Sequence, residues 1–111
     1  MLNKAPIGVI FDCDGTLLDS MGVWREMESE FAHRAGGELS PADKDLLTTL
    51  TTPEAGEFFH TKFGLGASSQ EVVRMVGEYM MEFYSTRATA RPGALEFVSA
   101  LFESGIRLSV A

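Results

Sequence analysis

The architecture is first indicated by a short run near the N-terminus, Ile7-Gly8-Val9-Ile10-Phe11-Asp12-Cys13-Asp14-Gly15-Thr16. Its apolar half shows no alternation, which is typical of a strand buried on both faces of a parallel sheet. The polar residues 12–16 then break the strand. Because ligands bind beyond the carboxyl ends of strands in open α/β sheets, we expect the functional site at this break.

From Asp19 to about Arg87 the sequence predicts four helices, because each segment carries a recognisable start or stop signal. The first would span Met21–Ala35, capped by Asp19 or Ser20. The second and third would begin at Ser40-Pro41 and Thr52-Pro53, and the fourth at the capping box Ser68/Glu71, with an apolar side of Val72, Val76, Tyr79, Met80 and Phe83. Four such helices can bury their apolar stripes against one another as a small bundle.

A fifth helix is expected at Ala94–Ser104, followed by a second strand at Ile106–Ala111. The inward side of this helix would be formed by Leu95, Val98, Leu101 and Phe102. The two strands and the helix would make a βαβ crossover. The predicted fold is therefore α/β, a partial Rossmann-like parallel sheet with an inserted α-helical bundle. Residues 1–18 and 90–111 would form the partial core, and residues 19–89 the helical cap domain.

Composition and charge exclude several classes of function. The 111 residues carry nine Lys and Arg against sixteen Asp and Glu, a net charge of −7, and no basic cluster, so nucleic acid is not an expected partner. No run of about twenty apolar residues is present, so no membrane partner is expected either. The single Cys13 excludes an intramolecular disulfide and fits a cytoplasmic location.

Asp12 and Asp14 are the candidate catalytic residues. Two carboxylates separated by one residue can project to the same side of an extended backbone. Asp12 could attack phosphorus and form an aspartyl phosphate, with Mg2+ offsetting the repulsion between the two anions. Asp14 could protonate the leaving oxygen and then deprotonate water. Gly15 would permit a tight turn and a close approach to phosphate, and Thr16 could fix the loop with its hydroxyl.

An Asx-rich turn is the structural alternative for this segment, since Asp and Gly favour turns for local reasons. The full pattern of residues 12–20 nevertheless resembles the first motif of the haloacid dehalogenase superfamily, in the subfamily of β-phosphoglucomutase and phosphoglycolate phosphatase. The segments Arg91-Pro92-Gly93-Ala94 and Gly105–Ala111 are similar to that family's approach to its second motif. The helical insertion lies where the family keeps its mobile cap.

This resemblance implies a magnesium-dependent phosphatase acting on a small phosphorylated metabolite. Asp12 would be nucleophile and metal ligand, and Asp14 would be acid/base with its backbone carbonyl on the metal. Trp24 and Arg25, at the start of the cap, would be candidate substrate contacts. The family's second, third and fourth motifs would follow Ala111, so we expect the 111 residues alone to be weak or inactive.

Other functions stay open at this stage. A β-phosphoglucomutase-like mutase is the enzymatic alternative, although the family's basic residue near the second cap helix has no counterpart in Leu47–Glu57. A phosphoacceptor signalling domain would need no helical insertion here. A non-catalytic helical module that binds another protein is the remaining alternative, and exposed sheet edges would allow self-association. Cys13 is expected to point into the core, and His33 and His60 to have surface or capping roles.

Overall fold

The computed structural model describes residues 8–111, so the predicted strand start at Ile7 lies outside the described residues. The chain divides into two compact units. The sheet unit comprises the residues up to Met21 together with Ala88–Ala111, and the helical unit comprises Gly22–Arg87. The predicted α/β class, a partial parallel sheet with inserted helices, is confirmed.

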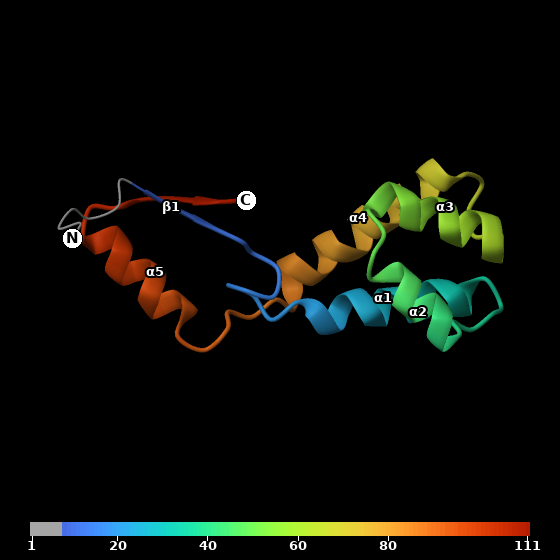
Figure 1. The fold of residues 1–111 in the computed structure, drawn as a ribbon, viewed down its shortest axis with the longest axis horizontal. Helices are drawn as coiled ribbons and strands as arrows, with labels where there is room; N and C mark the ends of the chain where they lie inside the picture. Colours follow the sequence, from blue (N-terminus) through green and yellow to red (C-terminus); the bar gives the residue numbers. More distant parts are fainter. Residues whose placement is uncertain (1–7) are drawn as a thin grey trace. The chain divides into compact units, whose positions relative to one another are not determined.

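The sheet unit contains β1 (Gly8–Phe11), α5 (Ala94–Glu103) and β2 (Arg107–Val110). The two strands pair in parallel, with Gly8 opposite Arg107 and Phe11 opposite Val110, and Figure 1 shows them side by side. The ladder continues beyond the strands, because the Ala111 amide donates to the Phe11 carbonyl at 2.8 Å. The carboxyl ends of both strands therefore reach the same edge of the sheet.

The prediction that the first strand is buried on both faces is wrong for residues 8–111. Val9 and Phe11 are half-buried, and the Phe11 ring meets Phe97 of α5 edge-on, with 6.1 Å between centroids. Ile10, on the opposite face, is 75% exposed. Within the described part of the sheet unit, α5 covers the face of Phe11 and leaves that of Ile10 open.

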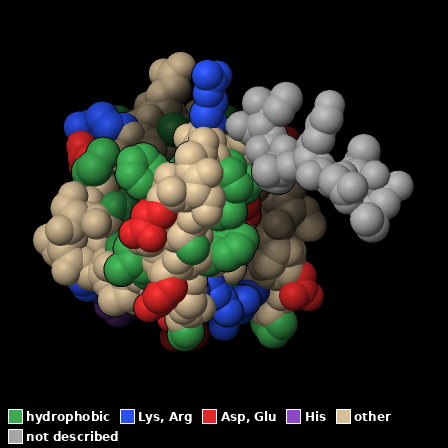
Figure 2. Space-filling model, turned by 90° about the vertical axis from the view of Figure 1, so that its left-hand side faces the viewer, with side chains coloured by type: hydrophobic (Ala, Val, Ile, Leu, Met, Phe, Trp, Pro, Cys, Tyr) green, Lys and Arg blue, Asp and Glu red, His purple; other side chains and the backbone are tan. Residues whose placement is uncertain are grey.

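The expected inward stripe of α5 is only partly correct. Val98 and Leu101 are half-buried, but Leu95 and Phe102 are 67% and 72% exposed. A sheet of two strands is too narrow to cover the whole apolar side of this helix. Hydrophobic side chains accordingly lie at the surface, among acidic ones, on the face that Figure 2 shows.

The helical unit contains α1 (Met21–Arg34, whose first residue belongs to the sheet unit), α2 (Pro41–Leu47), α3 (Thr52–Phe63) and α4 (Ser69–Thr86). Phe31 is wholly buried at its centre, where its ring meets Phe59 and Tyr79 edge-on at 5.9 and 6.1 Å. The predicted apolar side of α4 is confirmed, with Val72, Val76, Met80 and Phe83 buried. None of the helices within residues 8–111 is both long and apolar enough to span a membrane.

Capping explains where these helices begin. The Ser40 hydroxyl accepts from the Asp43 amide, and the Asp43 carboxylate accepts from the Ser40 amide, as the Ser40-Pro41 signal predicts. The cap of α3 is Thr51, so the predicted start signal at Thr52 was one residue late. Ser68 caps α4, but its box is incomplete because the Glu71 carboxylate accepts from the Ala67 amide instead.

The end of α3 is closed by a glycine and a histidine. Gly64 adopts a left-handed φ of 71°. The His60 ring lies against the Leu65 carbonyl, with 2.9 Å between Nδ1 and the oxygen. His60 thus contacts the backbone just past the end of α3, and His33 is exposed on α1, where surface or capping roles were expected for both.

Asp43 links α2 to α3. Its side chain is 8% exposed and forms a hydrogen-bonded ion pair with Lys62, whose ammonium also lies 5.6 Å from the centroid of the Phe58 ring. The hydrogen bond from Lys62 and that from the Ser40 amide hold the pKa of the Asp43 carboxyl below its ordinary value. The pair thus joins a helix cap to the neighbouring helix.

We predict that Asp43→Asn lowers the thermal stability of the helical unit at neutral pH and that the deficit shrinks in acid. A carboxyl whose pKa is depressed by folding stabilises the fold above its unfolded pKa of about 4 and loses that contribution as the pH falls below it. Melting curves between about pH 6 and pH 3 would test this. Asp45→Asn, an exposed carboxylate on the same helix, is the control and should show no such convergence.

Gly56 of α3 lies tightly against α4, and Gly77 provides a control. A Cβ on Gly56 would lie 2.6 Å from Val73 Cγ2 and 2.9 Å from the Ser69 carbonyl oxygen, whereas a Cβ on Gly77 would meet nothing within 4 Å. We predict that Gly56→Ala destabilises by about 1–3 kcal/mol through overpacking. Gly77→Ala should stabilise by about 0.5–1 kcal/mol through helix propensity. Chemical denaturation of both variants gives the two changes in the free energy of unfolding. Equal changes would contradict the tight packing inferred at Gly56.

Candidate active site

The loop after β1 closes on itself around one carbonyl. The Cys13 oxygen accepts from the amides of Thr16, Leu17 and Leu18 at 3.2, 3.0 and 3.1 Å. Gly15 makes this closure possible because its φ of 76° is in the left-handed region. Its amide donates inward, to the Leu18 carbonyl at 3.0 Å. Several backbone groups of the loop are therefore paired within the loop itself.

Asp12 lies at the carboxyl edge of the sheet, directly after β1, and is exposed. The Thr16 hydroxyl donates to its Oδ2 at 3.3 Å, a contact within the loop. Parallel pairing sets Ala111 alongside Asp12, since the Ala111 amide continues the ladder to Phe11. An exposed carboxylate at this edge is open to an incoming substrate.

Asp14 is half-buried and is held by Ser20. The Ser20 hydroxyl donates to Asp14 Oδ1 at 3.0 Å and accepts from the Gly15 amide at 3.2 Å. Ser20 itself is completely buried. The two carboxylates of the loop thus have different hydroxyl partners, Thr16 for Asp12 and Ser20 for Asp14.

The loop is joined to the returning chain by a short antiparallel pairing. The Asp19 amide donates to the Thr89 carbonyl at 3.0 Å, and the Arg91 amide donates to the Leu17 carbonyl at 2.8 Å. Leu18 and Ala90 form the bridge between these two bonds. The segments where the chain leaves and re-enters the sheet unit are therefore hydrogen-bonded to each other.

The loop offers some of the oxygen ligands that a hard cation such as Mg2+ needs. Mg2+ is often held by one or two carboxylates while it keeps several waters, and oxygen is its preferred ligand. Asp12 offers an exposed carboxylate, and Asp14 a second one nearby in sequence. Within residues 8–111 no group of three or more His, Cys, Asp or Glu side chains gathers as a metal site. The described loop can thus supply two oxygen-bearing residues to a cation.

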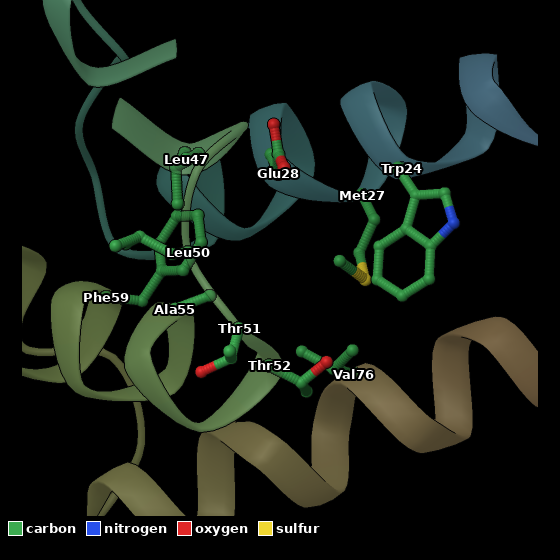
Figure 3. Close-up of a pocket in the computed structure, with 10 residues that line it drawn as sticks. All are labelled: Trp24, Met27, Glu28, Leu47, Leu50, Thr51, Thr52, Ala55, Phe59 and Val76. Atoms are coloured by element: carbon green, nitrogen blue, oxygen red, sulfur yellow. The ribbon is translucent and has the colours of Figure 1, made fainter. Parts of the chain in front are cut away.

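A pocket of about 70 Å³ lies within the helical unit and is lined by Trp24. Figure 3 shows Trp24 and Met27 of α1 pointing toward Thr52 and Val76, with Glu28 beside them. Burial raises the pKa of the Glu28 carboxyl, while the charge of Arg25 acts in the opposite direction. The lining is mostly apolar, and none of its residues is Lys or Arg.

Arg25 faces a second hollow of the same unit. That hollow has a volume of about 310 Å³ and is also lined by Glu28, Lys44 and Asp45. Its charges are mixed, with two cations and two carboxylates, so it shows no preference for an anion. Contact of Trp24 or Arg25 with substrate stays a prediction.

The structure brings Asp12, Asp14, Gly15 and Thr16 together in one loop and places Trp24 and Arg25 on α1. The Gly15 amide is used inside the loop, so its direct contact with phosphate stays a prediction. Ser20 was predicted only as a helix cap, and its bond to Asp14 was missed. Its position six residues after Asp14 carries no periodicity that could have indicated the contact.

Comparison with known proteins defines the fold. The sequence matches no protein-family model and no curated relative. A Thermotoga maritima protein assigned as a β-phosphoglucomutase matches with a TM-score of 0.71 and 20% identity over 93% of this chain and 48% of its own. An Entamoeba histolytica HAD hydrolase of family IA, variant 3, matches with a TM-score of 0.71 and 23% identity, over 93% of this chain and 47% of its own. A Lactobacillus plantarum protein assigned as a phosphoglycolate phosphatase matches with a TM-score of 0.56 and 24% identity, over 94% of this chain and 48% of its own.

The chain therefore has the fold of part of a haloacid dehalogenase-type protein, and the resemblance inferred from residues 12–20 is confirmed at the level of the fold. It spans about half the length of these solved structures. Identities below 25% establish the fold and leave activity to be argued from the loop itself.

We predict that Gly15→Ala disrupts the loop without unfolding the sheet unit. A Cβ at this position would lie 3.2 Å from Met21 Cγ, and the left-handed φ costs a non-glycine residue about 1–2 kcal/mol. Amide NMR shifts of residues 13–18 should change, while those of α5 should not. Gly22→Ala, where a Cβ meets nothing within 4 Å, is the matched control. Unchanged loop shifts in Gly15→Ala would contradict the assignment.

Proposed function

We propose that this chain carries the nucleophile and the acid/base of a phosphomonoester hydrolase, which acts through an aspartyl phosphate on a small phosphorylated metabolite. The observation that carries this proposal is the exposed Asp12 carboxylate at the carboxyl edge of a parallel sheet, two residues before the half-buried Asp14. Solved structures with the same fold include ones titled as a phosphatase, a hydrolase and a phosphoglucomutase, which supports phosphoryl transfer as the class of reaction.

In the proposed first step a carboxylate oxygen of Asp12 attacks phosphorus. The bond from phosphorus to the leaving oxygen breaks, and Asp14 gives its proton to that oxygen. In the second step Asp14 takes a proton from water while the water oxygen attacks phosphorus. The Asp12–phosphoryl bond then breaks, inorganic phosphate leaves, and both side chains return to their starting states.

Mg2+ fits this proposal as the cofactor. Asp12 and the backbone carbonyl of Asp14 would hold it, and when bound it would offset the negative charge shared by the carboxylate and the phosphoryl group. The work of this chain is to present Asp12 outward at the sheet edge and to keep Asp14 close to it. The hydrogen bonds within the loop support this proposal, because they restrict the backbone from which both side chains project.

Water is favoured over a second sugar phosphate as the final acceptor. The pocket lined by Trp24 has no Lys or Arg among its residues, and Leu47–Glu57, which contributes five of them, has none at all. A mutase must also hold a distal phosphate, for which cationic side chains are the usual partners. The helical unit would then select the organic part of the substrate, with Trp24 and Arg25 as candidate contacts.

We predict that Asp12→Asn abolishes phosphoryl transfer to the chain. The 111-residue protein would be incubated with acetyl phosphate and Mg2+, quenched in acid and analysed by mass spectrometry for an acyl phosphate. Because one phosphorylation event per chain is scored, slow turnover does not hide the result. Wild type should be labelled on Asp12 and the variant not at all, since an amide is not a nucleophile for this reaction.

Two further variants complete the experiment. Asp14→Asn should still be labelled by this activated donor but should hydrolyse the acyl phosphate about 100-fold or more slowly, because general-base assistance is lost. Glu103→Gln, an exposed carboxylate on α5, should behave as wild type. Labelling that persists in Asp12→Asn, or none in wild type, would overturn the proposed function.

A further inference from the structure

Ser20 is a buried polar side chain of the sheet unit that has no part in the mechanism proposed above. Ser20 is 0% exposed, and no buried polar side-chain atom within residues 8–111 lacks a hydrogen-bond partner. Its hydroxyl lies between the Gly15 amide and the Asp14 carboxylate. A wholly buried hydroxyl in this position can control the orientation of the carboxylate that it contacts.

The direction of both hydrogen bonds follows from elementary valence. The Gly15 amide can only donate, so Ser20 Oγ accepts that bond at 3.2 Å. The hydroxyl has a single hydrogen, and in the described part of the chain its acceptor is Asp14 Oδ1, at 3.0 Å. If Oδ1 carried the proton instead, the buried Ser20 hydrogen would face the hydroxyl oxygen of the acid, a weaker acceptor than a carbonyl oxygen, so this hydrogen bond favours the proton on Oδ2.

We propose that Ser20 is the positioning residue for Asp14, fixing Oδ1 as a hydrogen-bond acceptor and thereby assigning the transferable proton to Oδ2. This inference rests on the proposed function, in which Asp14 is the acid/base. In the first step the proton moves from Oδ2 to the leaving oxygen, and in the second a proton of water returns to Oδ2. Ser20 exchanges no proton, since its hydrogen stays on Oγ throughout.

Ser20 also connects this carboxylate to the start of α1. It is the residue directly before Met21, at which α1 begins, and its neighbour Asp19 is bonded to Thr89 of the returning chain. The position of Oγ is therefore set by backbone on both sides. A carboxylate held by such an anchor keeps one orientation, which is what repeated proton transfer requires.

The dependence of the phosphorylation rate on the leaving group distinguishes positioning of Asp14 by Ser20 from a merely structural role of Ser20. Expulsion of p-nitrophenolate needs little protonation, whereas expulsion of an alkoxide from ethyl phosphate needs a well-placed acid. We expect Ser20→Ala to slow phosphorylation of Asp12 by ethyl phosphate about tenfold or more relative to wild type, and by p-nitrophenyl phosphate less than about threefold. Ser20→Thr, which keeps the hydroxyl, should restore the wild-type ratio of the two rates.

Carboxyl NMR gives a readout that does not depend on turnover. The side-chain carboxyl carbon of Asp14, identified by its loss in Asp14→Asn, should shift in Ser20→Ala and return toward the wild-type position in Ser20→Thr. Hydrogen exchange of the Gly15 amide should accelerate in Ser20→Ala alone. Ser104→Ala is the control, because the Ser104 hydroxyl bonds only the Ala100 carbonyl within α5.

The outcomes distinguish this inference from the function on which it rests. Wild type labelled on Asp12, with both donors slowed equally in Ser20→Ala, would overturn the positioning role and leave the proposed function intact. An unchanged Asp14 carboxyl resonance in Ser20→Ala would overturn it as well. Absence of labelling in wild type, or labelling that survives Asp12→Asn, would remove the proposed function and with it the assignment of a catalytic proton.

Discussion

The structure of the loop after β1 depends on one turn, which the left-handed φ of Gly15 allows. Once φ at this residue is positive, the Cys13 carbonyl can accept three amides, and the Gly15 amide reaches both the Leu18 carbonyl and the Ser20 hydroxyl. A polar loop at a sheet edge must satisfy its backbone groups or leave them to water. This loop pairs several of these groups internally and others with the returning chain at Thr89 and Arg91, while its first carboxylate, Asp12, stays exposed.

Much of this could be predicted because the signals are local. An apolar strand, two carboxylates spaced by one residue and a glycine lie within a few residues of each other, and the caps at Ser40 and Ser68 follow the same logic. Where two neighbouring residues could both cap, as at Thr51 and Thr52, the sequence placed the start one residue too late. Such an ambiguity is resolved only by which side chain reaches the N3 amide.

Other features could not be read from the sequence, since they depend on residues far apart or on which elements are present. Periodicity identified the apolar side of α5, yet Leu95 and Phe102 are exposed because a two-stranded sheet cannot cover that side. The pairing of Leu17–Asp19 with Thr89–Arg91 joins segments on either side of the whole helical insertion. No local pattern encodes such a pairing, although it holds together the ends of a long insertion whose closure costs entropy.

The same limit explains why Ser20 was read as a helix cap. As a serine just before a helix it has the composition of a cap, and only the folded loop brings its hydroxyl to Asp14. Two carboxylates in one loop can take different chemical roles when their surroundings differ. Here Asp12 is exposed and accepts from the exposed side chain of Thr16, whereas Asp14 is half-buried and accepts from the wholly buried hydroxyl of Ser20. The different roles proposed for the nucleophile and the acid/base are therefore matched by different hydroxyl partners, Thr16 for Asp12 and Ser20 for Asp14.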